Sequence, residues 1–532
     1  MDRRNFIKTA SLFGAGSTIA SSLIGCQAYT EILLPHLAVV EPPAPVAGMT
    51  YIWASKIGCA LDCDLGTGRN KHTGHTATDD APRINAAMAG ASADNPLTLI
   101  IDGSALISGL FLPAGGYWSI AGLGGDSGFF IKSGSNSDGI VNASLSAPAL
   151  WQPGPPAPPR GQNVSLSNFT LNGNRSGDST SRLLLGTSTT WFCGINLVNL
   201  NNISIENIVT VNTPAFNFRF NNVGNVSVSG CIMMGNEPGS DGLHFDGPAN
   251  DIAISNCQFS TGDDSIALNC PEGYTGNISR VSVKDCTFNS WSLMRLDTIQ
   301  SYGAPDKFYI DSVSVSNCKG TLVNGGFLLG AGFGSNLDSV RDLTISDCSL
   351  TAPTILEVGV SFGQITLTNV TFTPSGSRQD PGFALMRTSS FFPDGTYVGT
   401  QLILNNCTIY RTNDQDVSLL IVVNDSVVKN MTLNALNIKN SKPYPPAQQL
   451  LHFPAGTMGQ LVINTLDSSN IRTLTTPQGY SMIGSICGVG VLATGWLIPD
   501  SVMEDGAPYI SASTGKPSIK VNGAVESYTA PS

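Results

Sequence analysis

Short runs in which apolar and polar residues alternate recur along most of the chain, and each run ends in asparagine or aspartate. Alternation with a period of two is typical of a β-strand with one buried face. The clearest copies occupy residues 164–169, 203–208, 252–257, 281–286, 313–318, 343–348, 365–370 and 402–407. The pattern predicts an all-β protein built from many short strands.

The spacing of these copies predicts how the strands assemble. The Asn or Asp positions 256, 285, 317 and 347 are separated by 29, 32 and 30 residues. A repeat of this size cannot bury its inner face alone, whereas stacked repeats share one interior. Asparagine suits the corners because it tolerates a left-handed backbone. We therefore predict a right-handed parallel β-helix, since the leucine pattern of leucine-rich repeats and the longer blades of propellers are missing.

Six of the twelve cysteines stand at equivalent places in the repeat: Cys231, Cys257, Cys286, Cys318, Cys348 and Cys407. Neighbouring coils would bring them roughly 4.8 Å apart along the strand-pairing direction. We predict a ladder of free, structural thiols. Cys59 and Cys63 have no accompanying motif, and a disulfide or metal role for this pair stays open.

The limits of the repeat divide the chain. We expect a Pro-rich tether at 27–50, an N-terminal cap with the first coils at 51–110, and the β-helix catalytic domain at 111–465. One helix is predicted near Thr78–Met88, with Thr or Asp at its start and Pro82 in its first turn. It would cover the open end of the coils. Residues 466–532 lose the repeat and suggest a small C-terminal β cap or an oligomerisation region.

The first 26 residues resemble an export signal. Arg3 and Arg4 precede a weakly apolar run that ends Leu23-Ile24-Gly25-Cys26. Paired arginines indicate the twin-arginine route, and the final residues resemble a lipobox with Cys26 as the acylated residue. An ordinary membrane anchor is the alternative, but the run is shorter than the ~20 apolar residues of a span. We expect an exported bacterial lipoprotein of the cell envelope, on the outer membrane or the periplasmic face, held to the membrane by its lipid.

The amino-acid composition limits which binding partners are expected. The net charge is −11 and only 12% of the residues are charged. Nucleic acid is therefore not an expected partner, because phosphate binding needs a basic face. With 41% hydrophobic residues, the chain is not expected to be disordered.

Three aspartates form the strongest candidate for chemistry. Asp241 lies 22 residues before Asp263, close to one coil, and Asp264 follows directly. Adjacent coils would bring the carboxylates together, and their repulsion would raise at least one pKa. A general acid and a general base separated in this way are what glycosidic bond cleavage requires. The alternative is that these residues cap backbone amides at turns.

Strand alternation adds a second set. If Leu243 and Phe245 point inward, several polar side chains near the aspartates point outward or lie at the edge of the cleft. We predict that five of them bind substrate: Asn217, Arg219, His244, Asp246 and Arg295. The two arginines would bind a carboxylate or hydroxyl groups of the substrate. Small Ala267 would leave room for a sugar ring. Glu272 lies in a nearby loop and is not expected to take part.

The segments Gly239-Ser240-Asp241-Gly242 and Gly262-Asp263-Asp264 resemble the polygalacturonase family, glycoside hydrolase family 28, in the pectin-lyase-like superfamily. The resemblance implies that Asp263 is the general acid and that Asp241 and Asp264 activate water in an inverting hydrolysis. The family's Gly-His-Gly and Arg-Ile-Lys motifs are missing, so galacturonan specificity is not supported. His244 or Arg295 would replace the missing histidine.

The resulting prediction is a glycoside hydrolase acting on a polysaccharide, without metal or cofactor. One alternative is a polysaccharide lyase in which the three aspartates bind Ca²⁺ and Arg295 removes a proton. The other is a non-catalytic glycan-binding surface β-helix. The Gly-Asp-Asp motif, without a repeated acidic ladder, favours hydrolysis.

Overall fold

The structure is a computed structural model. It describes residues 35–143, 155–175, 192–235, 239–298, 308–330, 339–375, 384–388, 397–412, 418–422, 426–443, 447–452, 457–474, 485–488, 490–491, 494 and 496–527. The predicted export signal with Cys26 and the start of the tether lie outside these ranges.

The chain packs into two units. The first runs to Ala267 and includes Glu272–Gly276, and the second comprises Leu268–Pro271 and the residues from Asn277 onward. Strand β16 (Asp264–Lys284) contributes residues to both.

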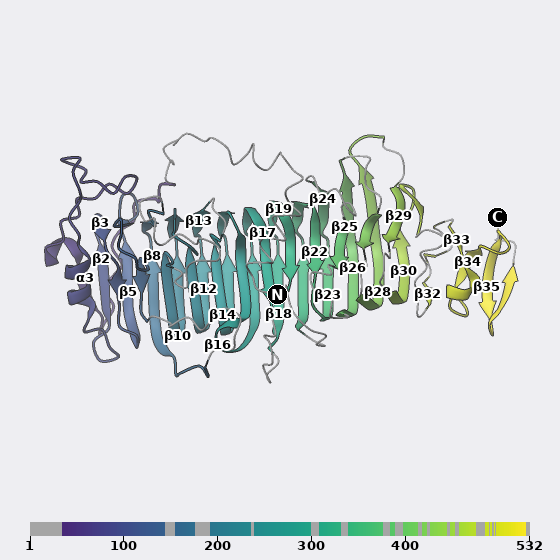
Figure 1. Ribbon diagram of the computed structural model, residues 1–532, viewed down its shortest axis with the longest axis horizontal. Coiled ribbons are helices and arrows are strands. Elements are labelled where there is room, and N and C mark those ends of the chain that lie inside the picture. Colours follow the sequence, from purple (N-terminus) through teal and green to yellow (C-terminus); the bar gives the residue numbers. More distant parts are fainter. Residues whose placement is uncertain are drawn as a thin grey trace. The chain divides into compact units, whose positions relative to one another are not determined.

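In the first unit, parallel strands stack coil upon coil (Figure 1). β12 pairs with β14 so that Phe218 lies opposite Leu243, one coil later. The same stacking joins β2 to β5, β5 to β8, and β10 to β12. The strands are β1 (Thr50–Trp53), β2 (Leu97–Ile101), β3 (Ser104–Ile107), β4 (Leu110–Phe111), β5 (Gly116–Gly122), β6 (Gly128–Ile131), β7 (Ile140–Val141), β8 (Gly161–Ser167), β9 (Thr170–Asn172), β10 (Ile195–Glu206), β11 (Val209–Val211), β12 (Phe218–Ser229), β13 (Ile232–Gly235), β14 (Leu243–Ser255) and β15 (Gln258–Thr261).

In the second unit, strands of successive coils also pair in parallel. Val313 of β18 lies opposite Leu343 of β20, and Leu343 lies opposite Ile365 of β23. Its parallel strands are β17 (Thr287–Asp297), β18 (Ile310–Ser316), β19 (Lys319–Leu329), β20 (Val340–Ser346), β21 (Ser349–Ala352), β22 (Thr354–Val358), β23 (Phe362–Thr368), β24 (Thr371–Pro374), β25 (Ala384–Thr388), β26 (Tyr397–Arg411), β27 (Ser418–Val422), β28 (Ser426–Asn440), β29 (Ala447–His452), β30 (Thr457–Leu466), β31 (Ile471–Thr473) and β32 (Ile486–Cys487). The nearly all-β, parallel arrangement of both units is compatible with the predicted β-helix.

A separate four-stranded sheet follows, with β33 (Leu497–Ile498), β34 (Pro508–Ser511), β35 (Pro517–Val521) and β36 (Ala524–Ser527). Strands β34, β35 and β36 pair antiparallel, unlike the coils. A capping or oligomer role for this sheet stays a prediction.

The corners of the coils confirm the expected backbone of the repeat. All eight Asn or Asp residues that end the repeats have φ between 50° and 58°: Asn168, Asn207, Asn256, Asp285, Asn317, Asp347, Asn369 and Asn406. Their side chains also bond from coil to coil. The amide of Asn369 donates to Asp347 at 2.9 Å, and that of Asn406 donates to Asn369 at 2.9 Å. The polar residue therefore serves both the left-handed turn and the contact between turns.

The cysteine ladder is confirmed as free and buried in the described residues. Each ladder thiol donates to the carbonyl two residues earlier, as Cys257 does to Ser255 at 3.2 Å. Cys59 and Cys63 are also free. Burial raises the pKa of each of these two thiols to about 12, so both are protonated at neutral pH.

The predicted helix is α3 (Ala81–Met88), with Pro82 in its first turn as expected. Asp80 occupies the N-cap position without a capping bond, because its carboxylate accepts the amides of Ala60 at 2.7 Å and Leu61 at 3.0 Å. The described chain also has the 3₁₀ turns η1 (Ala54–Ile57) and η3 (Asp500–Val502). A capping role for α3 stays a prediction.

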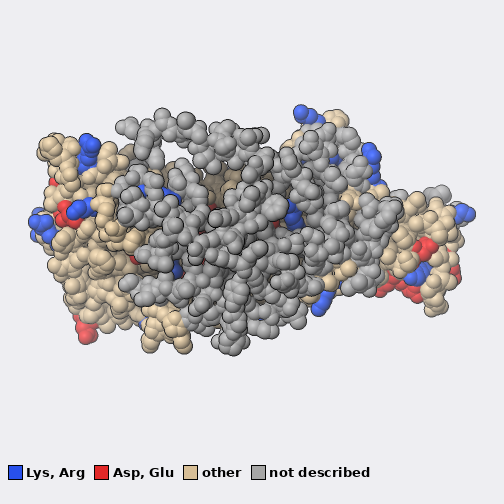
Figure 2. All heavy atoms as spheres, in the orientation of Figure 1, with Lys and Arg blue, Asp and Glu red and all other residues tan. Residues whose placement is uncertain are grey.

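Two surface properties bear on the expected partners. Among the described residues, the helices are too short or too polar to cross a bilayer. On the face drawn in Figure 2, basic and acidic side chains lie interspersed among uncharged ones over the described N-terminal coils. This mixed surface agrees with the low charge content of the sequence.

Candidate active site

The three aspartates come together where two successive coils begin a strand. Asp241 lies two residues before β14, and Asp263 directly precedes β16, which starts at Asp264. The Gly242 amide donates to the Asp264 carbonyl at 3.0 Å, which ties the two segments together. One carboxylate oxygen from each aspartate lies within 4.8 Å of the others. The one-coil spacing therefore produces the predicted cluster.

The cluster is more enclosed than an open cleft. Asp241 is 4% exposed and Asp264 is 3% exposed, whereas Asp263 is half-buried. The Gly239 amide donates to one oxygen of Asp263 at 3.0 Å. Asp263 is therefore the member of the cluster that solvent reaches most readily.

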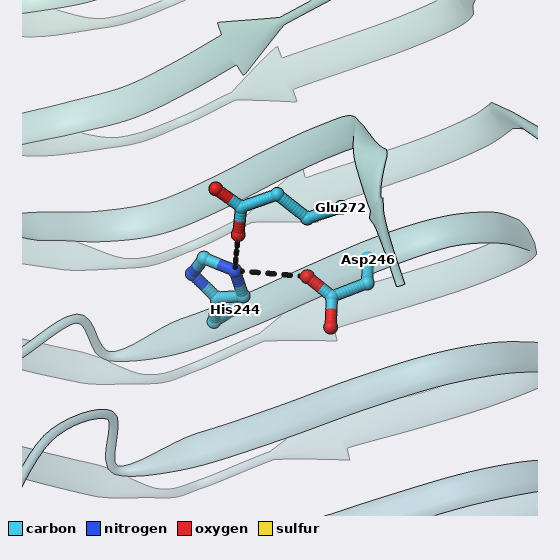
Figure 3. A group of neighbouring side chains, drawn as sticks. All are labelled: His244, Asp246 and Glu272. Carbon is cyan, nitrogen blue, oxygen red and sulfur yellow. Dashed lines mark hydrogen bonds and ion pairs between the residues drawn. The ribbon is translucent and has the colours of Figure 1, made fainter. Parts of the chain in front are cut away.

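His244 connects this cluster to two further carboxylates. Its Nδ1 lies 2.7 Å from Oδ2 of Asp241, and its Nε2 lies 3.0 Å from both Oδ1 of Asp246 and Oε2 of Glu272 (Figure 3). The ring stacks on Phe216, with centroids 3.8 Å apart and planes 8° apart. At 2% exposure, His244 is not the surface residue that strand alternation predicted.

The environment of His244 favours its protonated form. Burial lowers the pKa of His244, but the charge of Asp246 and the hydrogen bonds to Asp241, Asp246 and Glu272 raise it well above its ordinary value.

Asp246 is the other centre of this network. Its Oδ2 accepts from Nε of Arg219 at 2.7 Å and from the Asn221 amide at 2.8 Å. Burial opposes ionisation of Asp246, but Arg219 and then His244 lower its pKa to about 2. Burial lowers the pKa of Arg219, but the charge and hydrogen bond of Asp246, together with Cys193 and Glu272, raise it overall.

These contacts show where the structure places the residues predicted to bind substrate, and a substrate-binding role for them stays a prediction. Asn217 and Asp246 are fully buried, and Arg219 is 9% exposed. Asn217 donates its side-chain amide to the Asp241 carbonyl at 2.9 Å. These polar groups bind and orient one another, because side chains on neighbouring coils stack closely enough to satisfy each other. Ala267 is also buried.

Arg295 lies on β17 in the second unit and is half-buried. Its predicted role in substrate binding or proton removal stays a prediction.

Glu272 is the residue that sequence reasoning missed. It lies in β16, next to Gly273, which has φ +78°. A Cβ built at Gly273 would lie 1.8 Å from the Asn221 amide nitrogen. The Glu272-Gly273 pair could have indicated this contact from the sequence. A glycine at 273 allows the backbone to lie close to Asn221, and this places Glu272 next to His244.

Replacing Gly273 should therefore disturb the network from a distance. We expect Gly273→Ala to lower the free energy of unfolding by about 2 kcal/mol, from left-handed strain and from displacement of Asn221. Urea unfolding measures this. Gly74→Ala is the matched control, since Gly74 has φ +74° and no atom within 4 Å of the added Cβ. Equal losses in both variants would show that strain alone acts.

Two groups of described residues have metal-ligand spacing: His244 with Asp246 and Glu272, and the three aspartates. In the first, the donor atoms bind one another and Arg219, and a protonated ring repels a cation. This group therefore fits an ion-pair network better than a metal centre. In the second, Asp241 already pairs with the protonated ring, and three carboxylates supply few of the six to eight oxygens that Ca²⁺ takes.

Comparison with known proteins places this site in context. Residues 185–325, which contain all three aspartates, match the family model "Glycosyl hydrolases family 28". The chain resembles family 28. The match covers about a quarter of the chain, consistent with a divergent relative of the family 28 enzymes. No curated protein sequence matches the chain significantly.

Solved structures share the fold at low sequence identity. The surface protein and adhesin PfbA of Streptococcus pneumoniae has a TM-score of 0.51 at 15% identity, covering 76% of this chain and 100% of that chain. A family 28 exopolygalacturonase of Yersinia enterocolitica has a TM-score of 0.50 at 10% identity, covering 78% of each chain. At these identities the likeness concerns the fold alone.

Proposed function

We propose that the protein is a glycoside hydrolase that cleaves a polysaccharide by acid/base attack of water. The observation that carries this proposal is the convergence of three carboxylates from consecutive coils within 4.8 Å, in the segment that matches family 28. Paired carboxylates in a partly enclosed site are the usual apparatus for glycosidic bond cleavage.

The surroundings assign a role to each aspartate. Asp263, the half-buried member, protonates the glycosidic oxygen as the bond to the anomeric carbon breaks. Asp241 lies 2.7 Å from Nδ1 of His244, and pairing with a protonated ring would keep it ionised, as a base must be. Asp241 and Asp264 receive the proton of the attacking water while its oxygen bonds to the anomeric carbon.

The inverting course is implied by the resemblance to family 28. The carboxylate oxygens lie closer together than the roughly 6.5–9.5 Å usual between the acid and base of inverting enzymes. Proton NMR of the first-formed product decides the course directly. We expect the anomer opposite to that of the substrate, and the same anomer would contradict inversion.

A second candidate is a glycan-binding surface protein without catalysis. It is favoured by the fold match over all of the PfbA adhesin structure and by the burial of Asp241 and Asp264. The lyase alternative requires Ca²⁺ and Arg295, and its product absorbs ultraviolet light.

One digestion of a polysaccharide panel separates the three functions. Hydrolysis produces reducing ends without new absorbance and continues with chelator present. A lyase produces absorbance and stops with chelator. A binding protein retains a glycan and forms no product. We expect the first result.

We also propose that the mature protein is a lipoprotein of the bacterial cell envelope, acylated at Cys26 after twin-arginine export. The support is the Arg3-Arg4 pair and the Leu23–Cys26 segment. Three structural expectations are proposed separately. The β-helix is right-handed, α3 covers its N-terminal end, and the C-terminal sheet serves as an oligomer contact.

Removing the acylated residue should release the protein. In Cys26→Ala we expect loss of metabolic labelling with palmitate and a shift from the membrane to the soluble fraction. Cys487→Ala, a change of the same kind in the second unit, should keep both the label and the membrane location. A labelled Cys26→Ala variant would exclude this residue as the lipid site.

A further inference from the structure

We propose that His244 is a positioning residue for the hydrolysis: as an imidazolium it binds one oxygen of Asp241, orients that carboxylate and keeps it ionised for attack of water. This inference rests on the proposed function. The histidine that the family 28 motif would supply is missing from this sequence. We assign its place to His244, which is buried next to the three aspartates.

The geometry holds Asp241 at both ends. The Asn217 backbone amide and side-chain amide both donate to its carbonyl, at 2.8 and 2.9 Å. Nδ1 of His244 binds its Oδ2 at 2.7 Å. The ring is itself fixed by the stack on Phe216 and by two contacts at Nε2. The carboxylate is therefore held in one orientation, with Oδ1 as the oxygen that His244 does not bind.

Hydrogen-bond counting requires a doubly protonated ring. An ionised carboxylate only accepts hydrogen bonds, and a neutral imidazole has one N–H. Asp241 faces one ring nitrogen, whereas Asp246 and Glu272 face the other. With ionised carboxylates on both sides, both nitrogens donate, and the ring is a cation.

Charge balance leads to the same conclusion. The groups that face the ring are Asp241 and Asp246 on the β14 segment and Glu272 on β16. Arg219 of β12 compensates Asp246 from its other side. Asp263 and Asp264 lie near Asp241, with one carboxylate oxygen of each of the three within 4.8 Å of the others. These contacts set three carboxylates against one guanidinium, and a protonated His244 adds a second positive charge among them.

The test compares the pH dependence of kcat/KM in two variants. His244→Gln removes the cation, so the base should ionise less readily and the acidic limb should move to higher pH by about one unit. Glu272→Gln removes an anion behind the ring, so the acidic limb should move to lower pH. Opposite shifts are the signature of electrostatic control, since a merely structural role would lower kcat without moving the limb. His75→Gln, at an exposed histidine, should leave the profile unchanged.

A direct readout covers a His244→Gln variant that fails to fold. Nitrogen NMR of the folded wild type should show a protonated His244 ring at about pH 7.5, where an ordinary histidine is neutral. In Asp241→Asn the ring should lose its proton at lower pH than in the wild type. A neutral wild-type ring overturns the inference, and so do unshifted limbs in both variants of an active enzyme. A wild type that hydrolyses no glycan overturns the proposed function instead, and the catalytic role of His244 with it.

Discussion

Asp263→Asn should reduce hydrolysis by about 100- to 10,000-fold, the contribution of a general acid. Asparagine keeps the size of the side chain and can still accept the Gly239 amide, but it has no acidic proton for the departing oxygen. Reducing-end release from the best polysaccharide of the panel measures the loss. Asp94→Asn, at an exposed aspartate in the same unit, should retain full activity.

The leaving group provides a sharper control. An aryl glycoside with an acidic phenol departs without protonation, so Asp263→Asn should lose far less activity on it than on the polysaccharide. A general base would be needed equally for both substrates. Equal loss on both would therefore move Asp263 from the acid role to the base role, and wild-type activity on both would remove it from the chemistry.

Arg219→Met should cost about 3–5 kcal/mol of unfolding free energy, because it leaves the carboxylate of Asp246 buried without its main counter-charge. Urea unfolding near neutral pH measures this loss. The double variant Arg219→Met, Asp246→Asn should recover part of it, since no buried anion remains. The control is Lys132→Met, which breaks a half-buried pair with Asp79 and should cost about 1 kcal/mol or less. A similar cost for both single variants would contradict the importance of burial.

The same pair has a defined pH signature. The pKa of Asp246 is about 2 in the folded protein and about 3.9 in an unfolded chain. Its contribution to stability is therefore present above about pH 4 and is lost as pH falls toward 2. Arg219→Met should weaken this acid-dependent loss.

Much of the fold follows from local pattern. The period-two runs, the left-handed corners at residues such as Asn256 and Asn369, and the free thiols at the positions of Cys257 and Cys348 were all predictable. Each depends on the chain's own alternation and on a nearly constant coil length. The meeting of Asp241 with Asp263 and Asp264 follows for the same reason, because residues one coil apart lie on adjacent strands.

The support of the site was not predictable in this way. Alternation separated His244 from Leu243 and Phe245, but it cannot tell whether the opposite side is solvent or packed side chains. Glu272 reaches the ring through a local departure from the repeat at Gly273, where periodicity gives no guidance.

The sequence by itself therefore determined the coil architecture and the catalytic candidates, since both depend on spacing along the chain. Only the tertiary structure decided that Arg219, His244 and Asp246 form a buried charged network. The physical reason is that burial and pKa depend on every neighbour that surrounds a group, and those neighbours come from separate coils.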